Sequence, residues 1–189
     1  MLPALVKINK SLLRRRLRES LSRIGRSARR SRSRAIVSKV IRSRDFRRAK
    51  RVFTYVALPD EVDTRELITK ALALKKSVYV PHLGKSRDRI TIYRISNLAR
   101  DLRRGTFGIR QPKPSPGAKG RVSEMDLMII PGLGFDHGKG RLGRGLGCFD
   151  RLLKDAKDVK KVGLAFREQI VKRVPMTRRD VRVDRVIRG

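Results

Sequence analysis

Cysteine, histidine, tryptophan and long apolar runs are scarce or absent in this chain of 189 residues. A single cysteine, Cys148, cannot form an internal disulfide, and with only His82 and His137 beside it there is no zinc-ligand cluster of the usual spacing. No apolar run approaches the roughly 20 residues that a membrane-crossing helix needs. We therefore expect a soluble protein that is neither a disulfide scaffold nor a zinc module.

Acidic residues are also few, because 17 Asp and Glu face 50 Lys and Arg, which leaves a formal charge of +33. Such a field attracts polyanions of any kind, whether nucleic acid, an anionic membrane surface or a phosphorylated metabolite. The tract at residues 23–34, RIGRSARRSRSR, is typical of a nucleic-acid-binding arm or of a solvated basic helix and loop. Aromatic residues make up 5% of the chain and none lies in residues 1–45, so this tract lacks the stacking platforms that bind single strands.

Apolar residues recur at helical spacing in the basic N-terminal segment, which predicts helices over about 8–24 and 34–49. The Arg- and Ser-rich composition of this segment also resembles a mitochondrial transit peptide. The second apolar stripe favours a folded segment, because a cleavable leader has no need of it. We therefore expect residues 1–189 to form a single domain with a basic helical segment at 1–50, in the cytoplasm by default and in the mitochondrion as the alternative.

Beyond residue 50, strands alternate with helices, as in an α/β protein with a parallel sheet. We expect strands at about 51–57, 77–81, 89–95, 125–131, 160–166 and 181–187, and helices at about 63–74 and 145–157. The run MDLMIIP at 125–131 is the most convincing core strand, because it is apolar almost throughout. Residues 111–120, QPKPSPGAKG, read as a surface loop.

A glycine-rich loop follows the core strand, with the sequence PGLGFDHGKGRLGRGLGCFD at 131–150. Ligands bind at the carboxyl ends of strands in open α/β sheets, and glycines let backbone amides approach phosphate oxygens. Lys139, Arg141 and Arg144 add cations to this place. The loop therefore predicts a phosphate-binding site, with a flexible surface loop as the alternative.

Known nucleotide motifs fit this loop poorly. No GxxxxGK followed by Ser or Thr is present, and residues 138–143 match GxGxxG by letter but start seven residues after Pro131. Asp150 and Asp184 are candidate ligands for Mg²⁺, which takes one or two carboxylates when it is bound to a nucleotide. Asp150 can equally be an ion-paired helix residue, and Asp184 a surface acid.

Several motifs along nearly the whole chain resemble the 5-formyltetrahydrofolate cyclo-ligase family. The longest match runs from Asp126 to Leu152 and follows the family signature D-x-x-x-x-P-G-x-x-F-D-x-x-G-x-R-L-G-x-G-x-G. Shorter matches are the Lys-x-x-x-Arg of residues 10–14, YVALPDEVDT at 55–64, GIRQP at 108–112, LAF at 164–166 and VDRV at 183–186.

The resemblance implies a three-layer Rossmann-like α/β sandwich with a mostly parallel central sheet and N-terminal helices. It also implies an ATP- and Mg²⁺-dependent ligase, a monomer acting on small molecules, that converts 5-formyltetrahydrofolate to 5,10-methenyltetrahydrofolate with release of ADP and phosphate. Arg141 and Arg144 would be catalytic, Asp150 and Asp184 would hold the metal, and the folate would contact Val56, Glu61 and Phe149. ATP would be bound by Lys10, Arg14, Gly140, Arg141, Leu142, Gly143, Arg144, Gly145, Leu146, Gly147, Cys148 and Phe149.

The chain departs from the family where G-Y-Y-D becomes Gly147-Cys148-Phe149-Asp150, so that two phenolic hydroxyls are absent. Leu146 also stands where Gly or Lys is usual. Loss of one transition-state donor can cost about 10²–10³ in rate, so altered activity is one reading. The alternative function is that of a non-catalytic relative that binds RNA or another polyanion through its basic N-terminal region.

Overall fold

A seven-stranded sheet forms the centre of the computed structural model, which describes residues 3–84, 89–105 and 108–189. The strand order is β12-β10-β7-β1-β2-β3-β6. The first five are mutually parallel, and at one edge β3 pairs antiparallel with both β2 and β6. The strands are β1 (Arg51–Phe53), β2 (Ser77–Leu83), β3 (Ile90–Ile95), β6 (Lys119–Gly120), β7 (Leu127–Ile130), β10 (Lys160–Ala165) and β12 (Arg185–Arg188).

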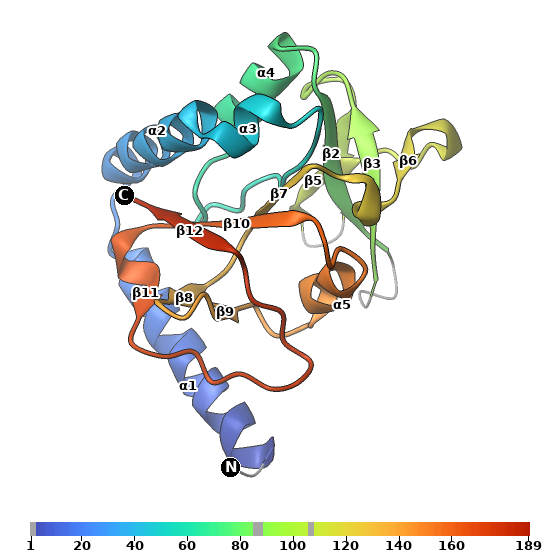
Figure 1. The fold of residues 1–189 in the computed structure, drawn as a ribbon. Coiled ribbons are helices and arrows are strands. Elements are labelled where there is room, and N and C mark those ends of the chain that lie inside the picture. The colour runs from blue at the N-terminus through green and yellow to red at the C-terminus, as the bar shows by residue number, and fades with distance from the viewer. Residues whose placement is uncertain (1–2, 85–88, 106–107) are drawn as a thin grey trace.

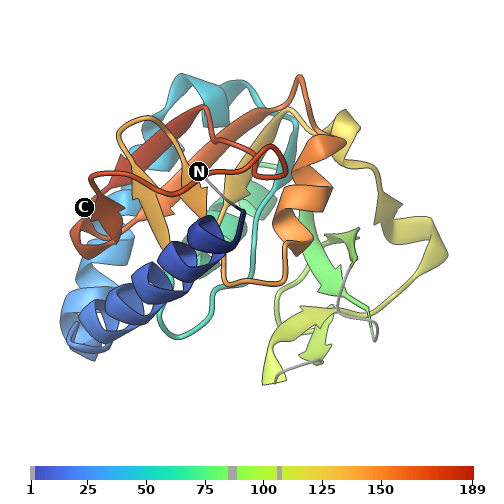
Figure 2. The ribbon, with the colours of Figure 1, turned by 90° about the horizontal axis from the view of Figure 1, so that it is seen from below.

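Helices cover both faces of this sheet (Figure 1). On one face lie α2 (Arg26–Arg42), α3 (Arg44–Arg48) and α4 (Arg65–Ala73). On the other lie α1 (Pro3–Ser22), α5 (Cys148–Lys154) and a small sheet of β8 (Gly134–Asp136), β9 (Arg141–Leu142) and β11 (Ile170–Val171), as Figure 2 shows from below. The predicted layered α/β fold with a mostly parallel sheet is confirmed.

The central strand β7 is apolar throughout, and its neighbours β1 and β10 are apolar after their first residues, because both faces of the sheet are buried. Val52, Leu127 and Ile129 belong to the core under α2 and α4. Their neighbours Phe53, Met128 and Ile130 belong to the second core, which includes Leu152 and Leu153 of α5. The alternation of side chains along each strand thus supplies two cores from one sheet.

Some element boundaries differ from the sequence-based prediction. The helix expected at 34–49 is interrupted at Ser43, whose hydroxyl accepts a hydrogen bond from the Phe46 amide at 3.2 Å and so begins α3. The strand expected at 51–57 ends at Phe53. The helix expected from about residue 145 starts at Cys148, because Gly145 and Gly147 have φ values of +124° and +67°, which no right-handed helix accepts.

The segment between β3 and β7 holds structure that the sequence did not predict. Its first part forms the hairpin of β4 (Leu102–Arg104) and β5 (Arg110–Pro112). The expected loop at 111–120 contains the end of β5, a 3₁₀ turn at Pro116–Ala118 and β6. In the parts of the chain that the structure describes, no helix is both long and apolar enough to cross a bilayer.

Candidate active site

A pocket of about 370 Å³ opens beside the carboxyl ends of β1 and β7. Its walls come from the loop after β1, the ends of β2 and β3, the hairpin strand β5 and the glycine-rich loop with the start of α5. Of the predicted site residues it brings together Val56, Glu61, Arg141, Gly143, Arg144, Leu146, Gly147, Cys148, Phe149 and Asp150. Residues 80 to 90 positions apart in the sequence therefore meet at this one place.

Arg141 is the buried cation of the pocket, with 2% of its side chain exposed. Its Nη1 donates to the Pro131 carbonyl at 3.3 Å, and its Nη2 lies 2.8 Å from Asp150 Oδ1. That ion pair falls short of hydrogen-bond geometry, so Nε and Nη2 are both buried without an acceptor. A buried guanidinium with unsatisfied donors is costly, and an anion in the pocket would satisfy it.

Asp136 fixes the turn that presents Arg141. Its Oδ1 accepts a hydrogen bond from the Gly140 amide at 2.7 Å, and its Oδ2 accepts one from the Val174 amide at 2.8 Å. A Cβ at position 140 would lie 2.7 Å from Asp136 Oδ2, so the turn needs glycine there. Leu142 packs with Leu17 of α1 and Val174, outside the pocket lining. Gly140 and Leu142 therefore fix the shape of the loop through contacts outside the pocket.

Arg144 joins the glycine-rich loop to the loop after β1. Its Nε donates to Glu61 Oε1 at 3.1 Å, and its Nη2 donates to Asp60 Oδ1. About a third of the Arg144 side chain is exposed. One planar guanidinium thus bridges two carboxylates on the far side of the pocket, a geometry that lysine cannot reproduce.

Glu61 is a buried carboxylate with 8% of its side chain exposed. Burial raises its pKa above the usual 4.5, against the opposing pull of Arg144 and of the hydrogen bond from the Leu58 amide at 2.9 Å. Burial also raises the pKa of the Tyr55 phenol, which donates to the Val62 carbonyl at 3.0 Å and so braces the same loop. A carboxylate held at this depth is suited to hydrogen-bond a polar edge of a ligand.

The rest of the pocket is largely apolar. Phe149 meets Phe53 edge to face with ring centroids 6.3 Å apart, and the Arg141 guanidinium lies 5.8 Å from the Phe149 ring centroid. Pro81, Leu83, Ile90 and Ile109 supply the opposite wall. An apolar slot with a few placed charged groups, here two carboxylates and two guanidiniums, is the usual make-up of a small-molecule site.

Lys10 and Arg14 of α1 lie outside the pocket lining, and only Arg14 contacts the glycine-rich loop. Arg14 Nε donates to the Gly143 carbonyl at 2.9 Å, and Gly145 follows in the same loop. Lys10 Nζ lies 2.6 Å from both carboxylate oxygens of Asp180, with 12% of each side chain exposed. Hydrogen bonds from Lys10 and Thr177 outweigh burial and hold the pKa of Asp180 below its usual value.

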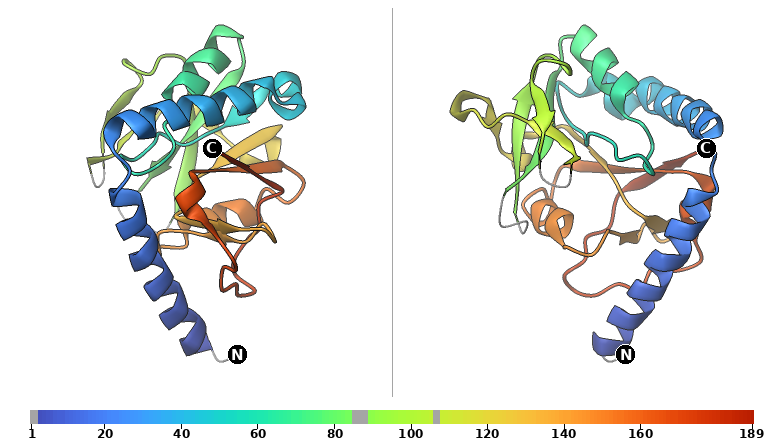
Figure 3. Two further views of the ribbon diagram at one scale, coloured as in Figure 1. Left: turned by 90° about the vertical axis from the view of Figure 1, so that its left-hand side faces the viewer. Right: turned by 180° about the vertical axis from the view of Figure 1, so that it is seen from behind.

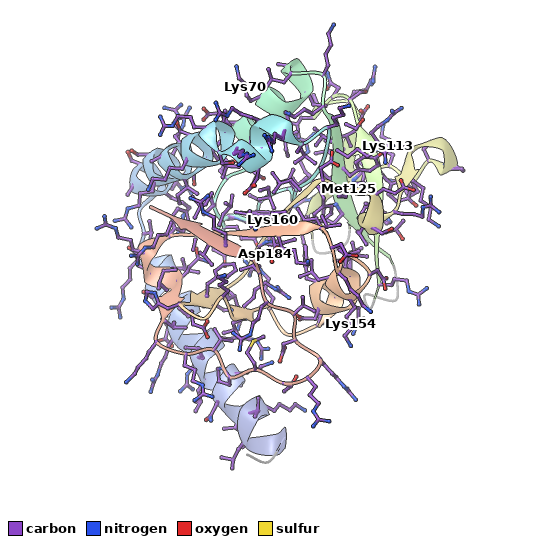
Figure 4. All side chains as sticks on the ribbon, viewed as in Figure 1. Lys70, Lys113, Met125, Lys154, Lys160 and Asp184 are labelled. Carbon is purple, nitrogen blue, oxygen red and sulfur yellow. The ribbon has the colours of Figure 1, made fainter. Side chains whose placement is uncertain are left out.

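The structure does not bring Asp150 and Asp184 together. Asp150 lines the pocket in the first turn of α5, where its Oδ1 also accepts from the Val181 amide at 3.2 Å. Asp184 is exposed, and its Oδ2 accepts from the Lys161 amide at 2.7 Å. Lys161 pairs with Met128, about 10 Å back along the sheet from Pro131, and Figure 4 shows Asp184 beside β10 and β12, away from α5.

These positions decide how a magnesium ion can fit. Among the described residues, no group of three or more His, Cys, Asp and Glu side chains could hold a metal. Asp150 alone faces the pocket, and one carboxylate with phosphate oxygens and water is a common set of ligands for Mg²⁺. The residues therefore fit an ion that arrives with a nucleotide, held by Asp150 without Asp184.

Three polar residues of the site were not named as site residues from the sequence. Asp60 and Asp136 lie inside the matched motifs, but their roles come from contacts with Arg144 and with amides at positions 140 and 174. Gln111 is buried and accepts from the Leu83 amide at 2.9 Å, which joins β5 to β2. The GIRQP motif that contains Gln111 was the available signal.

Comparison with known proteins gives the same picture as the motifs. The model of the 5-formyltetrahydrofolate cyclo-ligase family matches residues 6–189. A probable 5-formyltetrahydrofolate cyclo-ligase of Caenorhabditis elegans is 32% identical over 152 residues, which are 75% of this chain and 74% of that protein. The 5-formyltetrahydrofolate cyclo-ligase of Haemophilus influenzae is 30% identical over 137 residues, or 71% of this chain and 73% of that one.

Solved structures agree in fold. The NMR structure of 5,10-methenyltetrahydrofolate synthetase from Aquifex aeolicus has a TM-score of 0.83 and 30% identity, and the match covers 95% of this chain and 89% of that one. The Mycoplasma pneumoniae synthetase, at 18% identity and a TM-score of 0.73 over 94% and 97% of the two chains, shows the fold alone. This chain therefore belongs to the 5-formyltetrahydrofolate cyclo-ligase family and is an enzyme of the ligase class, as its motifs predicted.

Proposed function

We propose that this protein uses Mg-ATP to cyclise 5-formyltetrahydrofolate to 5,10-methenyltetrahydrofolate. The formyl oxygen attacks the γ-phosphorus and ADP leaves. N10 of the folate then attacks the formyl carbon and loses its proton, the carbon–oxygen bond breaks, and phosphate departs with the former formyl oxygen. Such a reaction asks for positioning and for cations around the transferred group rather than for acid–base machinery.

The observation that carries this proposal is the buried guanidinium of Arg141, which pairs with Asp150 but has no hydrogen-bond acceptor at Nε, in the same pocket as the buried carboxylate of Glu61. The first group is suited to a phosphoryl oxygen and the second to a polar heterocycle edge. Phe149 lines the same pocket next to Arg141 and offers a stacking surface for the heterocycle. The pocket therefore offers a cation for the phosphates of ATP and an apolar surface with a carboxylate for the flat ring of the folate.

Each residue has a role in this arrangement. Arg141 and the amides of residues 143–149 take the phosphates, and Arg14 braces the outer side of that loop at the Gly143 carbonyl. Lys10 pairs with Asp180 in the segment after β11. Glu61, Val56 and Phe149 take the folate. Arg144 holds Glu61 in place from the other side of the pocket, and it reaches the transferred phosphoryl group only by leaving Asp60 and Glu61.

Asp150 is the proposed magnesium ligand. The ion neutralises charge on the β- and γ-phosphates when it is bound. Asp150 also pairs with Arg141, so it orients the buried guanidinium in the absence of nucleotide. We assign Asp184 no part in this, because its carboxylate caps the Lys161 amide at the start of β10.

The proposal is tested by following methenyltetrahydrofolate absorbance with purified protein, 5-formyltetrahydrofolate and Mg-ATP, together with released phosphate. We expect one phosphate per product formed. The conservative variant Arg141→Lys keeps one positive charge but loses the planar fork, so it should lose at least about tenfold in kcat. Absence of turnover in the wild-type protein, with correctly folded enzyme, contradicts the proposal.

A small-molecule enzyme of this kind needs no partner chain, and a monomer in the cytosol is the simplest assignment. The mitochondrion is the alternative, and one Arabidopsis thaliana relative carries that location in its name.

A further inference from the structure

The outer surface of α2, α3 and α4 carries a concentration of positive charge that the proposed reaction does not use. Ten exposed cations lie on these three helices, against Glu66 as their one exposed acid: Arg26, Arg30, Arg34, Lys39, Arg42, Arg44, Arg47, Arg48, Arg65 and Lys70. We call this surface the α2–α4 basic face. Contacts of α2 with both α3 and α4 make it one continuous layer (Figure 1).

This face is separate from the pocket. No residue of α2, α3 or α4 lines the pocket, and the three helices lie across the sheet from α5. Figure 3 shows α2 along the outside of the molecule, while α1 runs away from it toward the N-terminus. A ligand of the basic face would therefore leave the pocket open.

Four arginines of α2, Arg26, Arg30, Arg34 and Arg42, are exposed, whereas the core residues of the helix are buried. Arg26 and Arg30 stand in the first turns on the same side as the core residues, and Arg42 lies on the opposite side. Ile36, Val37 and Val40 are at most 1% exposed. Within the described parts of the chain, no ion pair joins Arg26, Arg30, Arg34 or Arg42 to a carboxylate. Their spacing of four or eight residues places them about 6 or 12 Å apart along a helix of about 25 Å.

The chemistry of this face favours a double-stranded partner. Forked guanidinium groups spread over one surface match phosphate oxygens, which B-form duplexes present about every 1.7 Å along the axis. Single-strand binders add aromatic stacking, and the aromatic residue of these helices, Phe46, is fully buried. Membrane-surface helices insert an apolar side, whereas the apolar side of α2 already packs on the sheet.

We propose that the α2–α4 basic face binds the phosphate backbone of a nucleic-acid duplex, without reading its sequence. The helices lie flat on the sheet, so their side chains reach the backbone rather than enter a groove. Backbone contacts of this kind give affinities of about 10⁻⁴–10⁻⁶ M that fall steeply with salt. This binding does not depend on the proposed cyclisation, because the two surfaces share no residue.

The test compares two variants of equal charge. Arg26, Arg30, Arg34 and Arg42 are changed to Gln in the first, and four exposed arginines outside the face, Arg15, Arg94, Arg103 and Arg173, are changed to Gln in the second. Each variant then carries 33 − 4 = +29. Binding of fluorescent 20-base-pair RNA and DNA duplexes is measured between about 50 and 200 mM salt, with circular dichroism and thermal melting as checks on folding.

Each lost phosphate contact should weaken binding about tenfold near 0.1 M salt and lower the slope of log K against log salt by about 0.9. We therefore expect the α2 variant to lose at least about tenfold more affinity than its charge-matched control and to show a shallower slope. Equal losses in the two folded variants would show that binding follows net charge alone and would overturn the proposal. Tighter binding to a 20-nucleotide single strand or to phosphatidylserine vesicles than to either duplex would also overturn it.

Discussion

Replacement of Glu61 by Gln should leave the protein at least as stable at pH 7 while it weakens folate binding. Glu61 is 8% exposed and burial raises its pKa, so the folded chain pays a cost for ionising this carboxyl that the unfolded chain does not. The folded state therefore holds this proton to higher pH than the unfolded state. The contribution of Glu61 to stability falls as pH rises from about 4.5 through the raised pKa.

The amide of Glu61→Gln resembles the protonated form, so this pH-dependent loss should vanish. We expect the variant to be at least as stable as wild type at pH 7 and to lose that advantage near pH 4. Its oxygen can still accept from Arg144 or from the Leu58 amide. Thermal melts of the two proteins between pH 4 and 8 measure the effect, with Asp60→Asn as the matched control at the more exposed carboxylate that Arg144 also binds.

The same substitution, Glu61→Gln, should weaken folate binding although it does not weaken the fold at pH 7. Loss of one charge-assisted hydrogen bond to the folate costs about 1.5–3 kcal/mol, which is about 10- to 150-fold in KM for 5-formyltetrahydrofolate. The KM for ATP should stay within about twofold, since Glu61 and Arg141 lie on different walls of the pocket. A melting temperature that falls at pH 7, or a folate KM that does not change, would refute this reasoning.

Three further predictions follow from the contacts of the site. Asp150→Asn should raise the KM for Mg-ATP about tenfold or more and leave the KM for folate nearly unchanged. Equal increases in the two KM values would show that Asp150 serves only to hold Arg141. Phe149→Tyr should raise turnover about tenfold if a phenol assists the reaction. Cys148→Tyr should instead lower the free energy of unfolding by about 1–3 kcal/mol, because Cys148 is 8% exposed and the larger ring overfills its site. Lys10→Met leaves the partly buried Asp180 without its cation, so urea unfolding at pH 7 should show a loss of about 1–3 kcal/mol. The pKa of Asp180 lies below 3.8, so the wild type loses the stability contributed by the Lys10–Asp180 pair as pH falls through that lowered pKa. The difference in unfolding free energy between wild type and Lys10→Met should therefore shrink in acid. A difference that stays the same in acid would show that the pair is unimportant.

The sheet and the phosphate loop were predictable because their signals are local. An almost continuous apolar run such as 125–131, bounded by turn signals, favours a strand buried on both faces, and seven glycines after it favour a ligand loop. Strand lengths were less predictable. Tyr55 and Thr54 have strand-forming side chains, and the Thr54 amide still donates to the Tyr79 carbonyl of β2, but β1 ends at Phe53. The Tyr55 hydroxyl donates to the Val62 carbonyl of the loop that follows.

The partners of the charged residues were not predictable, because they depend on contacts between distant segments. Arg144 was expected at phosphate from its place in the loop, and it bridges Asp60 and Glu61, 84 and 83 residues away. Asp184 was expected beside Asp150, and nothing in the pattern VRVDRVI shows that its carboxylate caps an amide of β10. Motif resemblance located the pocket, and only the folded chain shows which oxygen faces which nitrogen.

The most direct test of the central claim uses 5-formyltetrahydrofolate with ¹⁸O in its formyl group, turned over with unlabelled Mg-ATP in unlabelled water. Transfer of the γ-phosphoryl group to the formyl oxygen requires that this oxygen leave with phosphate, so mass spectrometry should find one ¹⁸O in each phosphate released. Unlabelled phosphate, with product formed at the normal rate, would contradict the account.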